Sequence, residues 1–468
     1  MADSSHYDLV VIGAGPAGEK GAAQAAYFGK RVLVVEREPA PGGAAVHTGT
    51  LPSKTLRETA LYLSGYRARD LYGVAVELDP RATLQHLMSR KSAIAAAEAR
   101  SFMHNFDRHR IEYAHGAGRF VDPSTVVISS QDGERRVTGE FFLIATGSKP
   151  HRPSDIDFAD VCIHDSDEIL TIETLPQSLT VLGGGVIGCE YACMFAALRT
   201  RVTLVDARQE ILPFLDLEIV QRLRAAMQRL GIELVQGQRW KGVRRVGDAI
   251  ETTLADGRVL RTSDCLFAAG RTGASSGLGL DKAGLEPDSR GYIQVDHLFR
   301  TKVPHVLAAG DIVGFPALAS VSMEQGRVAV CHAFGFDYKK EVAAAMPYGI
   351  YTIPEVSSFG ETEESCKEKK IDYVAGRALF ADNPRGKITG DLEGATKLVV
   401  DANTRKILGV HVIGERASEL VHIGQTAITL GATVDVFIEM VFNYPTLADS
   451  YKYAAYECLG ALAKRAAH

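Results

Sequence analysis

Residues 7–36, YDLVVIGAGPAGEKGAAQAAYFGKRVLVVE, decide the fold of this chain. The segment opens with an apolar run, turns on three glycines, and continues with helix-forming residues. A second apolar run closes it and ends at Glu36. Both apolar runs lack polar alternation, as expected of parallel strands that are buried on both faces. The segment therefore predicts a strand, a helix and a second strand of a parallel α/β sheet.

A second segment repeats this plan further along the chain. Residues 179–206, LTVLGGGVIGCEYACMFAALRTRVTLVD, carry Gly183, Gly185 and Gly188 and end at Asp206. In both segments the acid follows the first glycine of the turn by 23 residues. A single G-x-G-x-x-G motif is weak evidence, but each copy here has a strand before it, a helix after it and an acid at the right distance. Two Rossmann units are therefore predicted.

The glycines and the acid have different chemical tasks. Glycine permits a tight turn and lets backbone N–H groups approach a pyrophosphate, which then lies at the positive end of the following helix. The acid accepts hydrogen bonds from an adenosine ribose. Two dinucleotide sites in one polypeptide indicate hydride or electron transfer between the two ligands.

Size and composition limit the other possibilities. A chain of 468 residues predicts about three domains. No stretch reaches the roughly 18 to 20 apolar residues of a membrane-spanning helix, and MADSSHY (1–7) lacks the basic and apolar regions of a signal peptide. The formal net charge of −5 gives no electrostatic footprint for nucleic acid. We therefore expect a cytoplasmic protein that binds neither membranes nor nucleic acid.

The cysteines give no sign of a disulfide framework or a metal site. Seven cysteines are scattered along the chain without the spacing of either. Cys189 and Cys193 are four residues apart and would share one face of a helix, where we expect them to be small packing residues.

Three further segments end alike. Each is an apolar strand that reaches Ala-x-Gly, a place where the backbone must come close to a ligand or to another segment. They are FFLIATGSKP (141–150), CLFAAGRTG (265–273) and HVLAAGDIVG (305–314). In the last of them Asp311 follows at the carboxyl end of a strand, where doubly wound sheets bind their ligands. A simple turn-forming role for Asp311 is the alternative.

Five motifs in a fixed order carry a resemblance to a known family. They are Gly13-x-Gly15-x-x-Gly18, Pro52-Ser53-Lys54, Ala145-Thr146-Gly147, Gly183-x-Gly185-x-x-Gly188 with Glu190, and Ala309-Gly310-Asp311. This set resembles the flavoprotein disulfide reductases that bind two dinucleotides, the family of lipoamide dehydrogenase and glutathione reductase. The resemblance runs from about residue 7 to the end of the chain. It implies an α/β protein with two Rossmann-like domains and a C-terminal α+β dimerisation domain, assembled as a homodimer or larger homo-oligomer.

The resemblance also implies the domain order. Residues 1–150 form the first segment of an FAD-binding domain, 151–274 an NAD(P)-binding domain, 275–345 the second FAD-binding segment, and 346–468 the dimerisation domain. The sequence of the last domain agrees with this division. TKLVVD (396–401) and KILGVHVIG (406–414) predict paired strands, and ASELVHIGQTAITL (417–430) predicts a helix.

Site residues follow from the same resemblance. Lys54 and Glu190 are expected to pair beside the flavin as the catalytic residues, and Asp311 to bind its ribityl chain. Two ordinary surface charges are the alternative for the pair. The implied FAD ligands are Gly13, Gly15, Gly18, Glu36, Gly43, Lys54, Ala117, Thr146, Gly147 and Asp311. The implied NAD(P) ligands are Gly183, Gly185, Gly188, Glu190, Asp206, Arg208 and Gly270.

The chain departs from the family in its thiol chemistry. The frame PGGAAVHTGTLPSK (41–54) carries Ala45 and Thr50 where the family has two redox-active cysteines. Near the C-terminus, Tyr444 and Asp449 stand where the family has a histidine and a glutamate that serve those thiols. Tyrosine, with an ordinary pKa of about 10, is a poor base at neutral pH. Disulfide reduction is therefore not expected. With Thr446, Asp449 also fits a helix capping box.

The electrons are then expected to pass between coenzymes. Only one nicotinamide unit is visible, so two nicotinamides must use its pocket in turn while FAD holds the hydride. GTLPSKTLRE (49–58) and FNYPT (442–446) resemble the soluble transhydrogenase branch of the family, although several members keep a cysteine at the position of Ala45. We expect ping-pong interconversion of NADPH + NAD⁺ and NADP⁺ + NADH. An NAD(P)H:quinone reductase on the same scaffold and a flavoprotein redox sensor remain alternatives.

One pocket for both coenzymes requires a compromise at the ribose. Asp206 suits the 2′-hydroxyl of NAD and by itself would repel the 2′-phosphate of NADP. Arg208, two residues on, can pair with that phosphate through charge-assisted hydrogen bonds. The sequence therefore predicts a loop that accepts either ribose, with a solvated surface charge as the alternative for Arg208.

Overall fold

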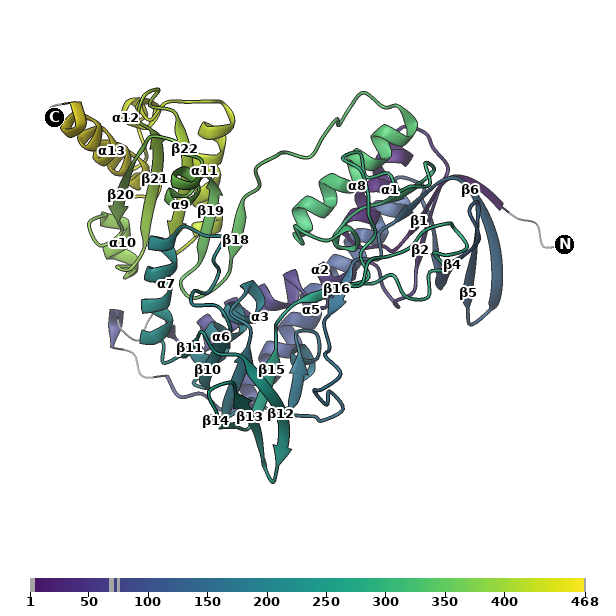
Figure 1. Ribbon diagram of the computed structural model, residues 1–468, viewed down its shortest axis with the longest axis horizontal. Coiled ribbons are helices and arrows are strands. Elements are labelled where there is room, and N and C mark those ends of the chain that lie inside the picture. Colours follow the sequence, from purple (N-terminus) through teal and green to yellow (C-terminus); the bar gives the residue numbers. More distant parts are fainter. Residues whose placement is uncertain (1–4, 67–70, 74–75, 467–468) are drawn as a thin grey trace.

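The computed structural model describes residues 5–66, 71–73 and 76–466. Figure 1 shows a lobe around β1, β2 and β6, a second lobe around β10 and β15, and a third lobe around β18 to β22. Helices and sheets are mixed in all of them, which confirms the predicted α/β class. Among the described residues, no helix is both long and apolar enough to cross a membrane.

The first lobe is built on a seven-stranded sheet in which distant segments meet. The strands follow the order β3-β2-β1-β6-β5-β4, and β17 pairs with β6. β1 is parallel to both of its neighbours, β2 and β6. The bounds are β1 Ser5–Ile12, β2 Val32–Glu36, β3 Glu112–His115, β4 Ala117–Asp122, β5 Thr125–Ser130, β6 Gly133–Ile144 and β17 Val306–Ala308, with helices α1 Pro16–Tyr27 and α8 Ala319–Phe334. α1 packs against α8, so the chain returns to its first sheet after residue 300.

The second lobe repeats the parallel core of the first. Its sheet has the order β11-β10-β9-β15-β8, and every neighbouring pair is parallel. The bounds are β8 Ile163–Asp165, β9 Ser178–Leu182, β10 Arg201–Asp206, β11 Glu233–Gln236 and β15 Asp264–Phe267, with α6 Val186–Ala197 and α7 Leu217–Arg229. An antiparallel sheet of β12 Trp240–Val246, β13 Ala249–Leu254 and β14 Val259–Thr262 is inserted before β15.

The third lobe is an antiparallel sheet covered by helices. The strand order is β18-β19-β22-β21-β20, and the predicted pairing of the two strands before the helix is confirmed. The bounds are β18 Tyr348–Ile350, β19 Val356–Gly360, β20 Tyr373–Leu379, β21 Ala395–Asp401 and β22 Ile407–Ile413, with α9 Glu363–Glu368, α10 Pro384–Thr389, α11 Ala417–Thr429, α12 Asp435–Glu439 and α13 Ser450–Ala466. α11 packs on β19 and β22, and α13 packs on β20 and β21.

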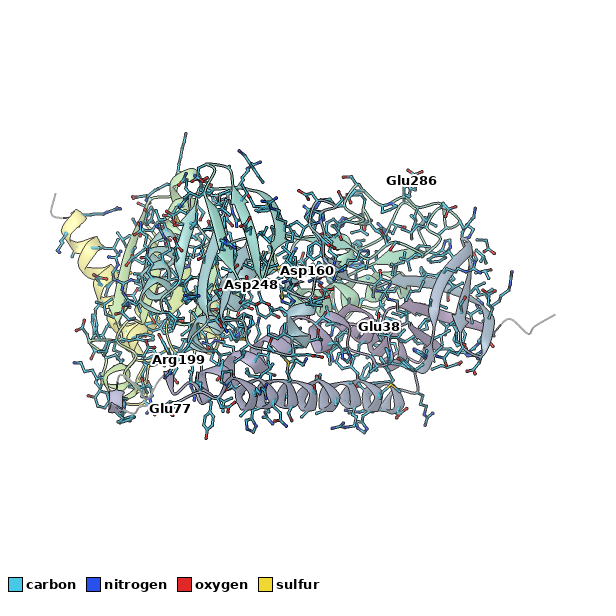
Figure 2. All side chains as sticks on the ribbon, turned by 90° about the horizontal axis from the view of Figure 1, so that it is seen from below. Glu38, Glu77, Asp160, Arg199, Asp248 and Glu286 are labelled. Atoms are coloured by element: carbon cyan, nitrogen blue, oxygen red, sulfur yellow. The ribbon has the colours of Figure 1, made fainter. Side chains whose placement is uncertain are left out.

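Several elements connect the lobes. Helix α5, Pro80–Arg108, is the long helix along the lower edge of Figure 2, and it packs against α3, Thr50–Leu63. α3 in turn packs against α6 of the second lobe, with Leu56 and Ala60 in the same apolar core as α6. Two short antiparallel strands, β7 Ser148–Pro150 and β16 Arg271–Gly273, cross between the first and second lobes.

A buried ion cluster fixes the second lobe to the third. Lys397 of β21 is only 1% exposed, and its ammonium lies 2.8 Å from Asp216 at the start of α7 and 2.5 Å from Glu363 of α9. Asp216 is fully buried. Because an unpaired charge in such a place is strongly destabilising, these groups hold α7 and the third sheet in one arrangement.

Candidate active site

The two glycine turns have almost the same backbone geometry. Gly15 caps α1 with φ −75° and ψ −175°, and Gly185 caps α6 with φ −80° and ψ −173°. A Cβ on Gly18 would lie 1.9 Å from the Gly13 oxygen, and a Cβ on Gly188 would lie 1.8 Å from the equivalent oxygen. Any larger residue at these positions would push the helix away from the turn. Both helix N-termini therefore face the site in the manner required for binding a pyrophosphate.

The acids at the strand ends are also held alike. Glu36 accepts hydrogen bonds from the backbone N–H of Ala14 at 2.7 Å and of Glu38 at 2.9 Å. Asp206 accepts the corresponding bonds from the N–H of Gly184 at 2.5 Å and of Arg208 at 2.7 Å. Each acid is thus fixed at the rim of its glycine turn, where a ribose would lie.

Arg208 distinguishes the second unit from the first. Its guanidinium donates to both oxygens of Asp206, from Nε at 2.9 Å and from Nη2 at 2.7 Å. Although burial opposes the effect, these bonds and the backbone donors hold the pKa of Asp206 below its usual range. The arginine side chain is 49% exposed, so it can reach a ligand at the rim.

The Ala-x-Gly segments come close to the glycine turns, as the sequence predicts. A Cβ on Gly13 would meet the Ala145 oxygen at 2.5 Å, and one on Gly183 would meet the Ala268 oxygen at 2.8 Å. In the third segment Gly310 has φ +85°, and its Cβ would lie 3.0 Å from Ala17 of α1. The carboxyl ends of β1, β6 and β17 therefore meet at one edge of the first sheet.

The residues at this edge fit FAD. The hydroxyl of Thr146 is buried and has no hydrogen-bond partner among the residues that the structure describes, which leaves it available to a ligand. Gly15 and Gly43 approach so closely that a Cβ on Gly43 would lie 3.0 Å from the Gly15 Cα, and Gly147 opens onto free space. Ala117 follows Gly116, whose N–H binds the Glu36 carbonyl, so the strand end with Ala117 borders the acid.

The equivalent edge of the second sheet fits a nicotinamide coenzyme. A Cβ on Gly185 would contact nothing within 4 Å, so the turn borders open space. Gly270, with φ +119°, follows β15, and a Cβ there would meet the end of the Arg290 side chain at 3.7 Å. Asp206 and Arg208 stand at the end of the neighbouring strand β10.

Lys54 and Glu190 come together between the two edges. The Lys54 ammonium lies 2.9 Å and 2.7 Å from the two carboxylate oxygens of Glu190. Lys54 lies about one turn into α3 and Glu190 lies on α6, so the packing of these two helices creates the pair. The lysine side chain is 24% exposed and the glutamate 8%, which means that the pair faces the site from a largely buried position.

Tyr351 belongs to the same group, although the sequence gives no signal for it. Its backbone N–H donates to Glu190 at 2.9 Å, and its ring lies under the Lys54 ammonium at 4.8 Å from the ring centroid. It arrives from the loop after β18, 161 residues beyond Glu190. A small cavity beside the pair is lined by Ser53, Arg57, Glu190, Tyr191, Met194 and Tyr351.

Asp311 is held by two hydroxyl groups. Ser148 donates to it at 2.8 Å and Ser322 at 3.4 Å. Ser148 itself is bound by Arg271 of β16, a residue that the sequence analysis did not single out. Asp311 thus lies at the crossing of the first and second lobes as well as at the strand edge.

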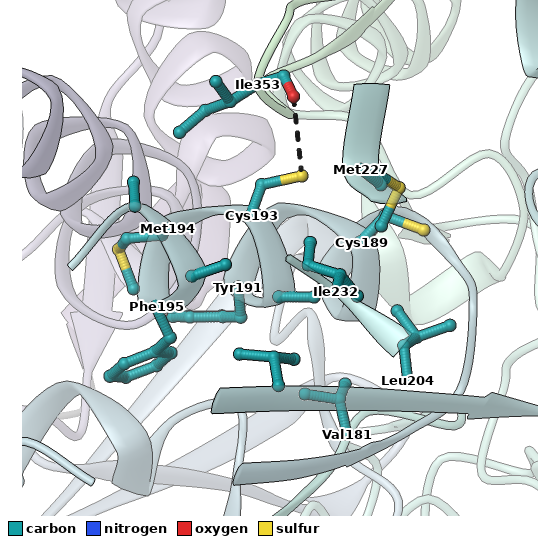
Figure 3. Close-up of a cluster of buried hydrophobic side chains, with 14 of the residues drawn as sticks. Val181, Cys189, Tyr191, Cys193, Met194, Phe195, Leu204, Met227, Ile232 and Ile353 are labelled. Carbon is teal, nitrogen blue, oxygen red and sulfur yellow. Dashed lines mark hydrogen bonds between the residues drawn. The ribbon is translucent and has the colours of Figure 1, made fainter. Parts of the chain in front are cut away.

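The structure contains no dithiol at the frame of Ala45 and Thr50. Ala45 lies in α2, Gly43–His47, and Thr50 begins α3. All seven cysteines are free. Cys189 and Cys193 are packing residues of α6, as predicted (Figure 3): both are fully buried, the Cys193 thiol contacts the Ile353 carbonyl at 4.0 Å, and burial raises its pKa to about 12.

Tyr444 and Asp449, which stand at the family's histidine and glutamate positions, precede α13 in the chain. Tyr444 is 74% exposed. The Thr446 hydroxyl accepts a hydrogen bond from the Asp449 N–H at 3.3 Å just before α13 begins at Ser450. Thr446 thus makes one half of the predicted capping box.

Comparisons with known proteins agree with this geometry. The family model "pyridine nucleotide-disulphide oxidoreductase" matches residues 7–326, and the dimerisation-domain model of the same family matches residues 346–455. The chain is 43% identical to a soluble pyridine nucleotide transhydrogenase of Mycobacterium tuberculosis over 97% of both chains, and 38% identical to one of Colwellia psychrerythraea over 99% of this chain and 100% of that protein.

Solved structures show the same architecture. LpdA from Mycobacterium tuberculosis superposes with a TM-score of 0.88 at 26% identity, covering 97% of this chain and 99% of that chain. Matches of this length include both glycine units and the C-terminal domain. The chain therefore belongs to the pyridine nucleotide-disulphide oxidoreductase family.

Proposed function

We propose that this chain is an FAD-dependent soluble NAD(P)⁺ transhydrogenase that interconverts NADPH + NAD⁺ and NADP⁺ + NADH. This proposal rests on one combination of features. The chain has two glycine turns of the dinucleotide-binding type, and it has Ala45 and Thr50 where the family has its redox-active cysteines. A dithiol that could pass electrons to an external disulfide is missing from these positions, so the coenzymes remain as donor and acceptor. The full-length relatives named as transhydrogenases support the same assignment.

The first sheet, with residues 1–150 and 275–345, would hold FAD. Gly13, Gly15 and Gly18 would receive its pyrophosphate, Glu36 its adenosine ribose, and Asp311 its ribityl chain. Gly43, Ala117, Thr146 and Gly147 border the same space. FAD, when bound, supplies the hydride-accepting and hydride-donating chemistry that links the two nicotinamides.

The second sheet, residues 151–274, would bind NADPH and NAD⁺ in turn. Gly183, Gly185, Gly188 and Gly270 would line the pyrophosphate path, and Asp206 with Arg208 would meet the ribose. A single pocket makes the reaction ping-pong, because one nicotinamide must leave before the other enters. Lys54 and Glu190 lie between the two sheets and would set the charge beside the reacting rings.

The third lobe, residues 346–468, would form a homodimer. It matches the family's dimerisation domain and exposes apolar side chains, among them Leu430 at 78% and Val441 at 94%. A second copy of the chain would cover such a surface. We further propose that the enzyme works in the cytoplasm, where both coenzymes are available.

The purified protein should be yellow and contain one FAD per chain. NADPH should bleach the flavin in the absence of oxygen, and NAD⁺ added afterwards should restore it, because the same pocket serves both coenzymes. Stopped-flow absorbance of the flavin measures both steps. Reoxidation by a quinone or by oxygen, but not by NAD⁺, would favour the quinone reductase. A reduced flavin that none of these reoxidises quickly would favour the redox sensor.

Full reduction should consume two electrons per subunit. Ala45 and Thr50 provide no second redox centre, and Cys189 and Cys193 are buried thiols with raised pKa values. An anaerobic dithionite titration counts the electrons, and thiol-blocking reagents should leave most of the activity. Consumption of four electrons would reveal another redox centre and contradict this prediction.

A further inference from the structure

The crossing strands β7 and β16 hold a hydrogen-bonded chain that the reaction scheme does not use. The two strands are antiparallel, with Ser148 opposite Gly273 and Pro150 opposite Arg271. They join the first sheet to the second. Through their side chains they also reach Asp311, at the edge proposed to hold FAD.

Arg271 donates two hydrogen bonds to Ser148. Its Nε donates to the Ser148 hydroxyl at 2.8 Å, and its Nη2 donates to the Ser148 carbonyl at 2.8 Å. The arginine side chain is only 17% exposed. Because a guanidinium can only donate, the hydroxyl oxygen must accept, and the hydroxyl hydrogen is left for another partner.

That partner is Asp311. Ser148 Oγ lies 2.8 Å from Asp311 Oδ2, so the direction of donation runs from Arg271 through Ser148 to the carboxylate. The other oxygen of Asp311 has a longer contact with Ser322, at 3.4 Å. The shorter hydrogen bond, from Ser148, therefore sets the orientation of the Asp311 carboxylate.

The opposite side of the guanidinium is fixed as well. Nη1 of Arg271 lies 3.8 Å from Asp167. Burial raises the pKa of Asp167, and the Arg271 charge and the Thr48 side chain act in the opposite direction. Thr48 lies between Ala45 and Thr50 in the frame that would face the flavin. Arg271 is thus balanced in charge and held at both ends, as expected of a group whose orientation matters to its neighbours.

We propose that Arg271 is a positioning residue that, through Ser148, holds the Asp311 carboxylate in the orientation that binds FAD. The inference rests on the proposed function, because it takes Asp311 to be a ligand of the ribityl chain. Arg271 belongs to the second lobe and Asp311 to the first. The chain from Arg271 through Ser148 to Asp311 therefore makes retention of FAD depend on the position of the second lobe relative to the first.

The test measures FAD release from the holoenzyme, without turnover. Holoenzyme is diluted, and the fluorescence of released FAD gives the release rate. Ser148→Ala and Arg271→Gln should each release FAD about tenfold faster, since each breaks the hydrogen-bonded link from Arg271 through Ser148 to the Asp311 carboxylate. The double variant should be no faster than either single variant, because both act through the same contact. Arg271→Lys, which keeps a donor near Ser148, should recover part of the retention.

The control is Arg300→Gln, which removes an equal charge from a side chain that is 47% exposed and pairs with Asp296. Its release rate should match that of the unaltered protein. Unchanged release in Ser148→Ala, or effects that add in the double variant, would overturn the proposal. If Arg271→Gln does not fold, Ser148→Ala, which removes only a hydroxyl, still decides. Since release needs no nicotinamide exchange, failure of the transhydrogenase assay would be a separate result.

Discussion

Replacement of Lys54 by methionine should slow reduction of the flavin by NADPH on the order of 100-fold while FAD remains bound, as for the loss of one preorganised charge at a reacting centre. The ammonium lies within 2.9 Å of both Glu190 oxygens and over the Tyr351 ring, so its position is fixed before any ligand arrives. A fixed positive charge stabilises the electron density that accompanies a hydride. Stopped-flow absorbance under anaerobic conditions measures the rate.

Two further variants separate charge from packing in this experiment. Lys54→Arg keeps the positive charge and should recover part of the rate. Lys282→Met removes a 64% exposed lysine that pairs with Asp281 and should leave the rate unchanged. A normal rate in Lys54→Met would end the idea that this ammonium assists hydride transfer, and loss of FAD from the variant would assign Lys54 to binding instead.

The parts of the fold that a local pattern specifies could be predicted from the sequence. Each glycine turn lies between a strand and a helix that are adjacent in the chain, and glycine is required there because a Cβ on Gly18 or Gly188 would collide with the turn. The strands β21 and β22 and the helix α11 also follow from local apolar patterns. Short-range sterics and burial decide such elements.

The contacts that complete the site could not be predicted in this way. Tyr351 reaches Glu190 across 161 residues, and Arg271 reaches Ser148 across 123. Lys397 pairs with Asp216, 181 residues away, although a lysine in a strand is expected to be a solvated charge. These partners depend on how complete sheets pack against one another. Even the Lys54–Glu190 pair was expected only from the family resemblance, since neither residue carries a local signal.

The selectivity of the coenzyme pocket can be argued from the difference between the two units. The first unit has Glu38 two residues after its acid, and the second has Arg208. In the second unit the arginine neutralises Asp206 through two side-chain bonds. A 2′-hydroxyl can bind the carboxylate while this pair persists. A 2′-phosphate has to draw the guanidinium away from the acid, and the 49% exposure of Arg208 leaves room for that movement.

Arg208→Ala should therefore weaken the binding of NADPH at least about tenfold. A charge-assisted hydrogen bond contributes roughly 1.5 to 3 kcal/mol, and the freed Asp206 would repel the 2′-phosphate. NADH should be affected much less. Asp206→Ala should do the reverse: NADH loses its ribose acceptor, while Arg208 becomes free for the phosphate. Dissociation constants for both coenzymes in both variants test the pair.

Arg229→Ala is the matched control for this experiment, since Arg229 carries the same charge in the same lobe but lies at the far end of α7, where it pairs with Glu393. Its constants should equal those of the unaltered protein. Equal losses of NADH and NADPH in Arg208→Ala would show that the arginine supports the loop without discriminating between the riboses. Opposite losses in the two variants would mean that the Asp206–Arg208 pair is what lets one pocket serve both coenzymes, as a ping-pong exchange between NADPH and NAD⁺ requires.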